Sequence, residues 1–302
     1  MLIEENIPLA RFTTIGTGGP ARAVARTGSL EDLEDALAWA SRRGLAVEVV
    51  GLGSNLLVAD EGVDALVVRL DGELAAARVE GDVVRAGGGA ALAVCLHRAR
   101  GAGLGGLEFA CAIPGTVGGG VRMNAGAYGG DIAGVLARAL VVDVRGAAWR
   151  RNADLSFSYR RSGLRRGEVV AQAELRLTPR PAADIRARVA AMQAERKAAQ
   201  PTNRRTFGSV FTNPEGHELT AGRLLDGCGL KGYRIGGARI SPRHANFIEN
   251  AGGARSADAL ALMAEARRRA LEQYGVELQR EVQFLGPLEL PPAGEVLELR
   301  RR

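Results

Sequence analysis

Residues 101–131, GAGLGGLEFACAIPGTVGGGVRMNAGAYGGD, form the stretch of this sequence whose composition most directly suggests chemistry. Glycine reaches positive φ and lets the main chain approach a ligand closely, so runs of its N–H groups can form concave nests for phosphate oxygens. Pro114 fixes one φ, and apolar anchors favour a rigid, packed loop over a flexible linker; the anchors are Ile113, Val117, Val121 and Met123. We therefore expect a loop, rather than a helix or strand, that holds a nucleotide pyrophosphate.

A second loop of the same kind lies between two apolar runs, where Gly51, Gly53, Ser54 and Asn55 form a turn. The common phosphate motifs are absent. Residues 87–92 imitate a dinucleotide fingerprint but carry Leu92 where a third glycine is needed, and no Gly-Lys pair exists for a Walker A loop. Neither HExxH nor GxSxG occurs. The phosphates are therefore expected on loops of a fold other than the Rossmann fold.

Composition indicates a soluble globular protein of two or three domains, because the 302 residues are 46% hydrophobic and 25% charged. The N-terminus, MLIEENIPLA, lacks the apolar region of a signal peptide, and no run approaches the roughly 18 apolar residues of a membrane span. We expect a cytoplasmic protein without membrane contact. Cys95, Cys111 and Cys228 are odd in number and widely spaced, so we expect three buried thiols, no disulfide framework and no metal site.

The net charge of +6 raises the question of nucleic acid binding. The basic residues are spread along the chain, and aromatic residues make up only 4%, so stacking platforms for bases are scarce. A diffuse positive surface suits an anionic small substrate equally well. We expect such a substrate and no nucleic acid partner.

The elements that must position these loops can be read from periodicity and capping. Ser29 and Asp32 form a capping box before a helix that Gly44 ends, and Gly275 closes the last helix. The expected helices span residues 29–43, 90–100, 181–199, 218–228 and 256–274. The expected strands span residues 45–50, 140–144, 169–177, 207–214, 246–249 and 276–285, with a hairpin at 77–86.

Several segments of the chain form one longer pattern. The most specific is LGGLEFACAIPGTVGGGVRMNAGAYG at 104–129, preceded by GTGGPARAV at 16–24 and GLGSNLLV at 51–58. The pattern continues in SYRRS at 158–162, FGSVFTNP at 207–214, GLKGYRIGGARISPRHANFIEN at 229–250 and LQREVQFLG at 278–286. Together these segments resemble the UDP-N-acetylenolpyruvoylglucosamine reductase family, and they cover nearly the whole chain in the family's order.

The resemblance implies an α+β fold, with two FAD-holding subdomains of the vanillyl-alcohol-oxidase type and a C-terminal α+β substrate domain. It further implies that NADPH reduces a non-covalently bound FAD. Hydride then passes to the enolpyruvyl group of UDP-N-acetylglucosamine enolpyruvate, giving UDP-N-acetylmuramate for peptidoglycan. We expect a monomer or a weak dimer.

The same resemblance assigns cofactor-binding residues to the glycine-rich loops. In the loops at 16–19 and 51–56 they are Gly16, Gly18, Gly19, Gly51, Gly53, Ser54, Asn55 and Leu56. In the central stretch they are Ile113, Pro114, Gly115, Thr116, Gly118, Gly119, Asn124, Gly126, Ala127 and Tyr128.

Three catalytic residues follow from the resemblance. Arg160 matches the arginine placed on the substrate carboxylate and developing enolate, a task that suits a permanently charged, bidentate guanidinium, although its neighbour Arg161 could be confused with it. Ser209 matches the proton donor. Glu281 matches the catalytic glutamate, and the sequence places it in the last strand as an inward-facing carboxylate.

Substrate binding is expected from Asn213, Lys231 and Arg234, with Tyr159 and His244 as further candidates. The chain departs from the family at Thr212, where lysine is frequent, and at Ala112 and Gly120, where glycine and alanine are usual. The short region between Arg160 and Pro201 resembles the subclass without the extra substrate-covering insertion.

We expect FAD subdomains at 1–70 and 71–200, a substrate domain at 201–286 and a tail at 287–302. Two alternatives remain open. One is another FAD-linked oxidase or dehydrogenase of the same fold that acts on an alcohol or hydroxy acid. The other is a flavin- or nucleotide-binding protein without turnover.

Overall fold

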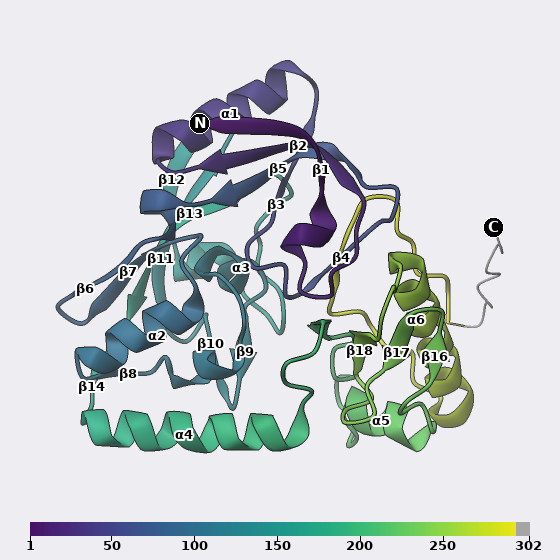
Figure 1. Ribbon diagram of the computed structural model, residues 1–302. Helices are drawn as coiled ribbons and strands as arrows, with labels where there is room; N and C mark the ends of the chain where they lie inside the picture. The colour runs from purple at the N-terminus through teal and green to yellow at the C-terminus, as the bar shows by residue number, and fades with distance from the viewer. Residues whose placement is uncertain (294–302) are drawn as a thin grey trace. The chain divides into compact units, whose positions relative to one another are not determined.

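The computed structural model describes residues 1–293 and divides them into two compact units. Unit 1 comprises Met1–Ile7, Arg22–Leu52 and Asp64–Ala198. Unit 2 comprises Pro8–Ala21, Gly53–Val63 and the described residues from Ala199 onward. Each unit therefore draws on separated parts of the chain (Figure 1).

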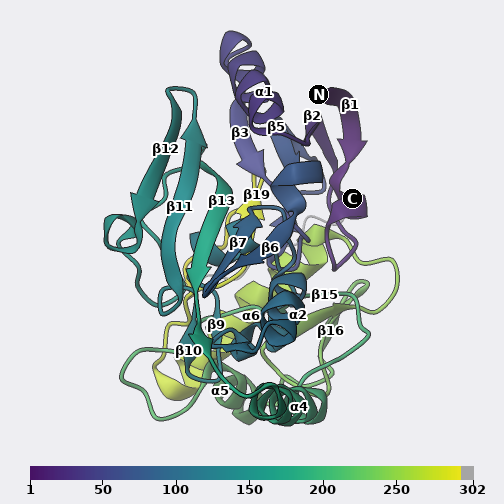
Figure 2. The same cartoon turned by 90° about the vertical axis from the view of Figure 1, so that its left-hand side faces the viewer.

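Unit 1 contains two sheets. The first has the strand order β1-β2-β5-β3, with β1 at Leu2–Pro8, β2 at Pro20–Thr27, β5 at Val63–Leu70 and β3 at Ala46–Val49. The second is antiparallel in the order β12-β11-β13-β7-β6, with β12 at Gly146–Arg151, β11 at Leu136–Asp143, β13 at Val169–Arg176, β7 at Val83–Gly87 and β6 at Ala77–Glu80. Figure 2 shows the long strands β12, β11 and β13 side by side.

Three helices of unit 1 bury apolar residues against these sheets, namely α1 at Leu30–Arg42, α2 at Leu92–Gly101 and α3 at Val117–Arg122. A fourth helix, α4 at Ala182–Ala199, contributes Ile185 and Val189 to the same buried core as α2 and α3. The Ser29 hydroxyl accepts the Asp32 N–H at 3.1 Å and caps α1 as expected, while the Asp32 carboxylate accepts the Gly28 N–H at 3.0 Å. Short strand pairs join β8 at Leu104–Gly105 to β14 at Thr178–Pro179, and β9 at Gly126–Ala127 to β10 at Gly130–Asp131.

Unit 2 contains one antiparallel sheet in the order β15-β18-β17-β16. These strands are β15 at Thr206–Ser209, β18 at Phe247–Asn250, β17 at Ala238–Ile240 and β16 at Arg234–Ile235. Helix α5 at Ala221–Gly227 and helix α6 at Ser256–Tyr274 share a buried core with this sheet. A parallel pair joins β4 at Leu56–Val58 to β19 at Gln283–Leu285.

Short 3₁₀ helices connect several of these elements in the two units. They are η1 at Leu9–Phe12, η2 at Gly72–Ala75, η3 at Glu108–Ala112 and η4 at Asn152–Leu155.

Three expectations about local structure are wrong. Part of the glycine-rich stretch is helical, because the Thr116 hydroxyl caps α3 by accepting the Gly119 N–H at 3.3 Å and Val117 and Val121 are fully buried. The expected strands at 207–214 and 276–285 shorten to β15 and β19, because residues 210–212 and 279–282 pair with one another instead. Cys111 is only half-buried, whereas Cys95 and Cys228 are buried. The part of the expected tail from residue 294 onward lies outside the described residues.

Candidate active site

Ser209 and Glu281 lie on neighbouring segments of unit 2. The Glu281 N–H donates to the carbonyl of Val210 at 2.8 Å, one residue beyond Ser209. Both side chains are half-buried, and Ser209 is the last residue of β15. Glu281 lies two residues before β19 rather than within it, which corrects its expected place in the last strand. The backbone nevertheless brings two of the three predicted catalytic residues, Ser209 and Glu281, together.

The predicted flavin loop at residues 53–56 contacts the segments that carry Ser209 and Glu281. The Asn55 side-chain amide donates to the carbonyl of Glu281 at 3.4 Å, and the Asn55 carbonyl accepts the Gln283 N–H at 3.0 Å. Gly208 has a φ of +81°, and a Cβ there would lie 3.3 Å from the carbonyl oxygen of Ser54. Unit 2 therefore places Ser54 and Asn55 beside both predicted catalytic residues.

Three of the predicted substrate-binding residues, Asn213, Lys231 and His244, contact helix α5, whereas Arg234 does not lie on it. The Asn213 side-chain oxygen accepts the Ala221 N–H at 3.1 Å, at the first residue of the helix. Lys231 pairs with Asp226 near the end of α5, with 2.6 Å between Nζ and Oδ2. Arg234 is exposed and lies in β16, opposite Arg239 of β17.

The imidazole of His244 is the third group at α5. A Cβ at Gly222 would lie 2.5 Å from its Cε1, so the glycine leaves room for the ring. Burial lowers the pKa of His244, and the nearby Lys231 ammonium lowers it further. Its Nδ1 accepts the Asn246 N–H at 3.2 Å, which leaves Nε2 as the protonated nitrogen. His244 is therefore a neutral hydrogen-bond donor at pH 7.

Two residues of α5 itself have roles that the sequence does not signal. Asp226 is the carboxylate partner of Lys231, and Gly222 makes the space for the His244 ring. Both contacts depend on how the chain folds back onto α5 rather than on a sequence motif. Thr212, the departure from the family pattern, uses its hydroxyl to donate to the carbonyl of Gln279 at 3.2 Å.

Most glycines of the predicted flavin loops at 16–19 and 53–56 are required by the protein's own packing. A Cβ at Gly18 would lie 2.7 Å from Cβ of Val58, and Cβ atoms at Gly19 and Gly53 would overlap the carbonyl oxygens of Asp60 and Phe12. Gly16 has φ +75° but only the flexible Arg205 side chain near it, and Leu56 begins β4.

The remaining predicted glycines of unit 1 are of two kinds. A Cβ at Gly51, in the loop at 51–56, would lie 2.5 Å from the Thr116 hydroxyl, and one at Gly118, in the central stretch, would lie 3.0 Å from the carbonyl oxygen of Gly88. In contrast, no atom lies closer than 3.8 Å to a Cβ at Gly115 or closer than 3.5 Å to one at Gly119, and neither residue has positive φ. The protein's own packing therefore does not explain Gly115 and Gly119.

Asn124 and Tyr128 adopt left-handed backbone conformations, with φ +40° and +51°. Their side chains are bonded within unit 1. The Tyr128 hydroxyl donates to the Met192 carbonyl of α4 at 3.1 Å. The Asn124 amide donates to the Ser158 carbonyl at 3.1 Å, and its oxygen accepts the Ala133 N–H at 2.9 Å. The same central stretch contains the other predicted cofactor-binding residues Ile113, Pro114, Gly126 and Ala127.

Arg160 and Tyr159 form the tip of a tight turn in unit 1. Ser158 and Arg161 close the turn by two backbone hydrogen bonds of 3.1 Å each. Arg160 has φ +57°, and its guanidinium lies over the Tyr159 ring, 4.8 Å from the ring centroid. A left-handed arginine is uncommon, and strained residues of this kind cluster at functional sites.

Among residues 1–293, no group of three or more His, Cys, Asp or Glu side chains could hold a metal ion. No helix in that part of the chain is both long and apolar enough to cross a membrane.

Two family models match the chain. Residues 21–150 match the FAD binding domain, and residues 200–285 match the UDP-N-acetylenolpyruvoylglucosamine reductase C-terminal domain. The first range contains the central glycine-rich stretch, and the second contains Ser209 and Glu281.

Whole-length relatives agree with these matches. The chain is 44% identical over 281 residues to UDP-N-acetylenolpyruvoylglucosamine reductase 2 of Symbiobacterium thermophilum, covering 92% of this chain and 91% of the relative. It is 39% identical to the reductase of Bacillus licheniformis, covering 94% of each.

A solved structure also agrees with the fold. The crystal structure of the reductase from Thermus caldophilus superposes with a TM-score of 0.83 at 38% identity, covering 94% of this chain and all of that one. The α+β fold expected from the sequence, with an FAD-binding part and a C-terminal part, is thereby confirmed. The chain is an FAD-binding oxidoreductase and belongs to the UDP-N-acetylenolpyruvoylglucosamine reductase family.

Proposed function

We propose that the chain catalyses the NADPH-dependent reduction of UDP-N-acetylglucosamine enolpyruvate to UDP-N-acetylmuramate in peptidoglycan synthesis, with FAD as its cofactor. The main structural support is the grouping of Ser209, Glu281 and the Ser54–Asn55 loop in unit 2. A proton donor beside a cofactor loop is part of what hydride addition to a carbon–carbon double bond needs, because the carbanion that forms must be protonated.

The chemistry assigns a task to each predicted catalytic residue. FAD, which the glycine-rich loops would hold, would supply the hydride that it receives from NADPH. When the terminal carbon of the enol ether receives hydride, the carbon–carbon π bond breaks and negative charge spreads into the adjacent carboxylate. Arg160 holds that carboxylate and stabilises the charge. Ser209 delivers a proton to the neighbouring carbon, which completes the lactyl ether, and Glu281 lies beside Ser209 within unit 2.

Steady-state kinetics tests the proposal against the two alternatives. NADPH consumption should depend on the enolpyruvyl sugar. An oxidase of the same fold would instead turn over an alcohol or hydroxy acid with O₂, and a binding protein would show no sugar-dependent consumption. The purified protein should be yellow and release FAD, not FMN, on denaturation; colourless protein that takes up no added FAD would contradict the proposal.

Gly115 and Gly119 give a test of where the flavin binds. Because the protein leaves room for a Cβ at Gly119, Gly119→Ala should not destabilise the fold, and alanine in helix α3 should stabilise it by up to about 1 kcal/mol. The same methyl group should obstruct a closely bound flavin and lower FAD occupancy. The measurements are the FAD-to-protein ratio and the unfolding free energy of the apoprotein.

A matched control is Gly101→Ala, at the last residue of α2, where no atom lies within 4 Å of the added Cβ. This variant should keep its FAD. Normal FAD content in Gly119→Ala would show that this glycine does not face the cofactor.

Lys231 is proposed to contact the substrate diphosphate. Lys231→Ala should weaken binding of the UDP-sugar roughly tenfold to a hundredfold, because a charge-assisted contact contributes about 1.5–3 kcal/mol, and should leave the flavin in place. Titration of the flavin absorbance with substrate measures both effects.

The ion pair with Asp226 supplies the control for Lys231. The two side chains are 37% and 50% exposed, so the pair itself should contribute little to stability. Asp226→Ala removes the pair but keeps the ammonium, and substrate affinity should be unchanged or tighter. Equal losses of affinity in Lys231→Ala and Asp226→Ala would indicate that the pair supports the fold and that Lys231 does not face the diphosphate.

A further inference from the structure

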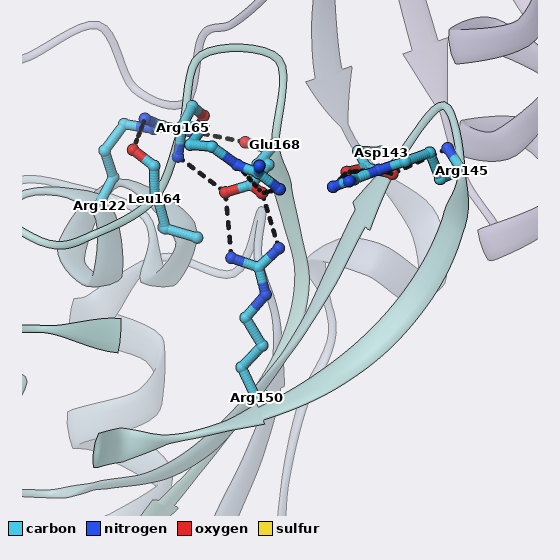
Figure 3. A network of polar contacts seen from close by, with 7 residues as sticks. All are labelled: Arg122, Asp143, Arg145, Arg150, Leu164, Arg165 and Glu168. Carbon is cyan, nitrogen blue, oxygen red and sulfur yellow. Dashed lines mark hydrogen bonds and ion pairs between the residues drawn. The ribbon is translucent and has the colours of Figure 1, made fainter. Parts of the chain in front are cut away.

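The segment that follows Arg160 is bonded to the C-terminal end of α3 by one guanidinium. Arg122 Nη2 donates to the carbonyls of Glu168 at 2.6 Å and Arg165 at 3.1 Å, and Nη1 donates to the carbonyl of Leu164 at 3.5 Å (Figure 3). The Ser162 hydroxyl donates in return to the Arg122 carbonyl at 2.7 Å. Arg122 therefore bonds to the segment 162–168 through its guanidinium, which donates, and through its carbonyl, which accepts.

The start of the same segment is bonded to Asn124, two residues further along the glycine-rich stretch. Asn124 is 5% exposed, and its amide donates to the Ser158 carbonyl and to the Asp131 carboxylate, at 3.1 and 3.2 Å. Ser158 is the first residue of the turn that carries Arg160. Arg122 and Asn124 thus bond the chain after and before Arg160.

The far end of the segment is secured by a buried carboxylate. Glu168 is 2% exposed, and it accepts hydrogen bonds from Arg150 Nη2 at 2.7 Å and from the Arg165 N–H at 2.7 Å (Figure 3). The segment from Ser158 to Glu168 is consequently fixed at both ends and along its length. Such redundancy is what a left-handed residue such as Arg160 needs in order to persist.

We propose that Arg122 and Asn124 are positioning residues that hold the Arg160 guanidinium in place for the substrate carboxylate. They act through the backbone of the Ser158–Glu168 segment and do not touch the reacting atoms. The inference rests on the proposed role of Arg160 and adds the side chains that fix its location.

Two conservative variants test the proposal. Arg122→Lys keeps the charge but loses the fork that spans several carbonyls. Asn124→Asp keeps the shape but loses the amide donor and sets a second carboxylate against Asp131. In each, re-oxidation of the reduced flavin by the enolpyruvyl sugar should slow about tenfold to a hundredfold, because small misplacements of a catalytic group have effects of this size. In Arg122→Lys, FAD content and flavin reduction by NADPH should stay near wild-type values. Asn124 is also a predicted cofactor-binding residue, so Asn124→Asp is compared through the re-oxidation rate of its FAD-loaded fraction. Ser162→Ala, which removes a single bond, should show a smaller loss of the same kind.

The discriminating measurement is made in the Arg160→Ala background. If Arg122 and Asn124 act through Arg160, their substitution there should slow re-oxidation no further. Arg166→Gln is the matched control, because Arg166 belongs to the same segment but pairs with Glu48, and its side chain is 73% exposed. That control should leave both half-reactions unchanged.

Four results would overturn the proposal. Equal slowing of both half-reactions, or loss of FAD, in Arg122→Lys would assign Arg122 to the flavin loop. A full additional loss in the Arg160→Ala background would assign them to the fold. If both conservative variants re-oxidise at the wild-type rate while Arg160→Ala is slow, the positioning role is refuted and the proposed role of Arg160 stands. If Arg160→Ala itself re-oxidises normally, the proposed role of Arg160 fails and the positioning role fails with it.

Discussion

Replacement of Ser209 by alanine is expected to leave flavin reduction by NADPH nearly intact and to slow reduction of the enolpyruvyl sugar roughly 10²–10⁴-fold. The two half-reactions separate because reduction of the flavin requires no proton on a substrate carbon. The second half-reaction must protonate the carbanion that hydride addition creates. Ser209→Cys should retain part of the activity, since a thiol is also a proton donor of similar reach.

Stopped-flow absorbance of the flavin distinguishes the two phases in one experiment. Bleaching by NADPH at close to the wild-type rate, followed by much slower recovery on adding the sugar, is the expected result. If both phases slow equally, Ser209 positions the flavin and is not the proton donor. The donor role would then pass to Glu281, whose backbone N–H bonds to the residue after Ser209.

Glu168→Gln is expected to destabilise the protein by about 3 kcal/mol at pH 7. Burial alone would raise the pKa of Glu168, but hydrogen bonds from Arg150 and Arg165 outweigh it and lower the pKa from 4.5 to about 2. The neutral amide would leave the Arg150 guanidinium, whose side chain is 25% exposed, without its carboxylate. Chemical denaturation measures the loss.

The pH dependence of the unfolding free energy shows whether the loss comes from the ion pairs of Glu168. Because the folded-state pKa of Glu168 lies below its ordinary value, its contribution is complete above about pH 4.5 and is lost as the pH falls toward 2. The difference in unfolding free energy between wild type and Glu168→Gln should therefore shrink over that interval. Glu80→Gln, where the exposed carboxylate pairs with Arg78 and Arg85 at the surface, should cost less than about 1 kcal/mol at any pH. A difference that does not change with pH would argue against the ion pairs.

Capping and periodicity were sufficient to predict the helices that carry their own signals. Ser29 caps α1, and Gly275 ends α6 with φ +67°, both as the sequence predicts. Helix α3 escaped prediction because three of its six residues are glycine. Its stability comes from burial of Val117 and Val121 and from the close approach of Gly118 to Gly88, which are tertiary effects that propensity does not contain.

The resemblance to a family supplied residue types for the site, but not their contacts. It pointed to Lys231 and Asn124, yet gave no indication that Asp226 would pair with Lys231 or that Asn124 would bond to the Ser158 carbonyl. Glycine is ambiguous for the same reason. Gly53 is explained by the protein's own backbone, whereas Gly119 is not, and only coordinates separate the two cases.

The central claim, that this chain reduces an enolpyruvyl sugar, is tested most directly by the product. Under anaerobic conditions the purified protein should convert NADPH and UDP-N-acetylglucosamine enolpyruvate into equal amounts of NADP⁺ and UDP-N-acetylmuramate. With NADPH deuterated at the transferred position, mass spectrometry should find deuterium on the terminal carbon of the lactyl group, while the proton on the adjacent carbon comes from solvent. Reduced flavin that the sugar leaves unoxidised, and that only O₂ re-oxidises with release of peroxide, would contradict the account.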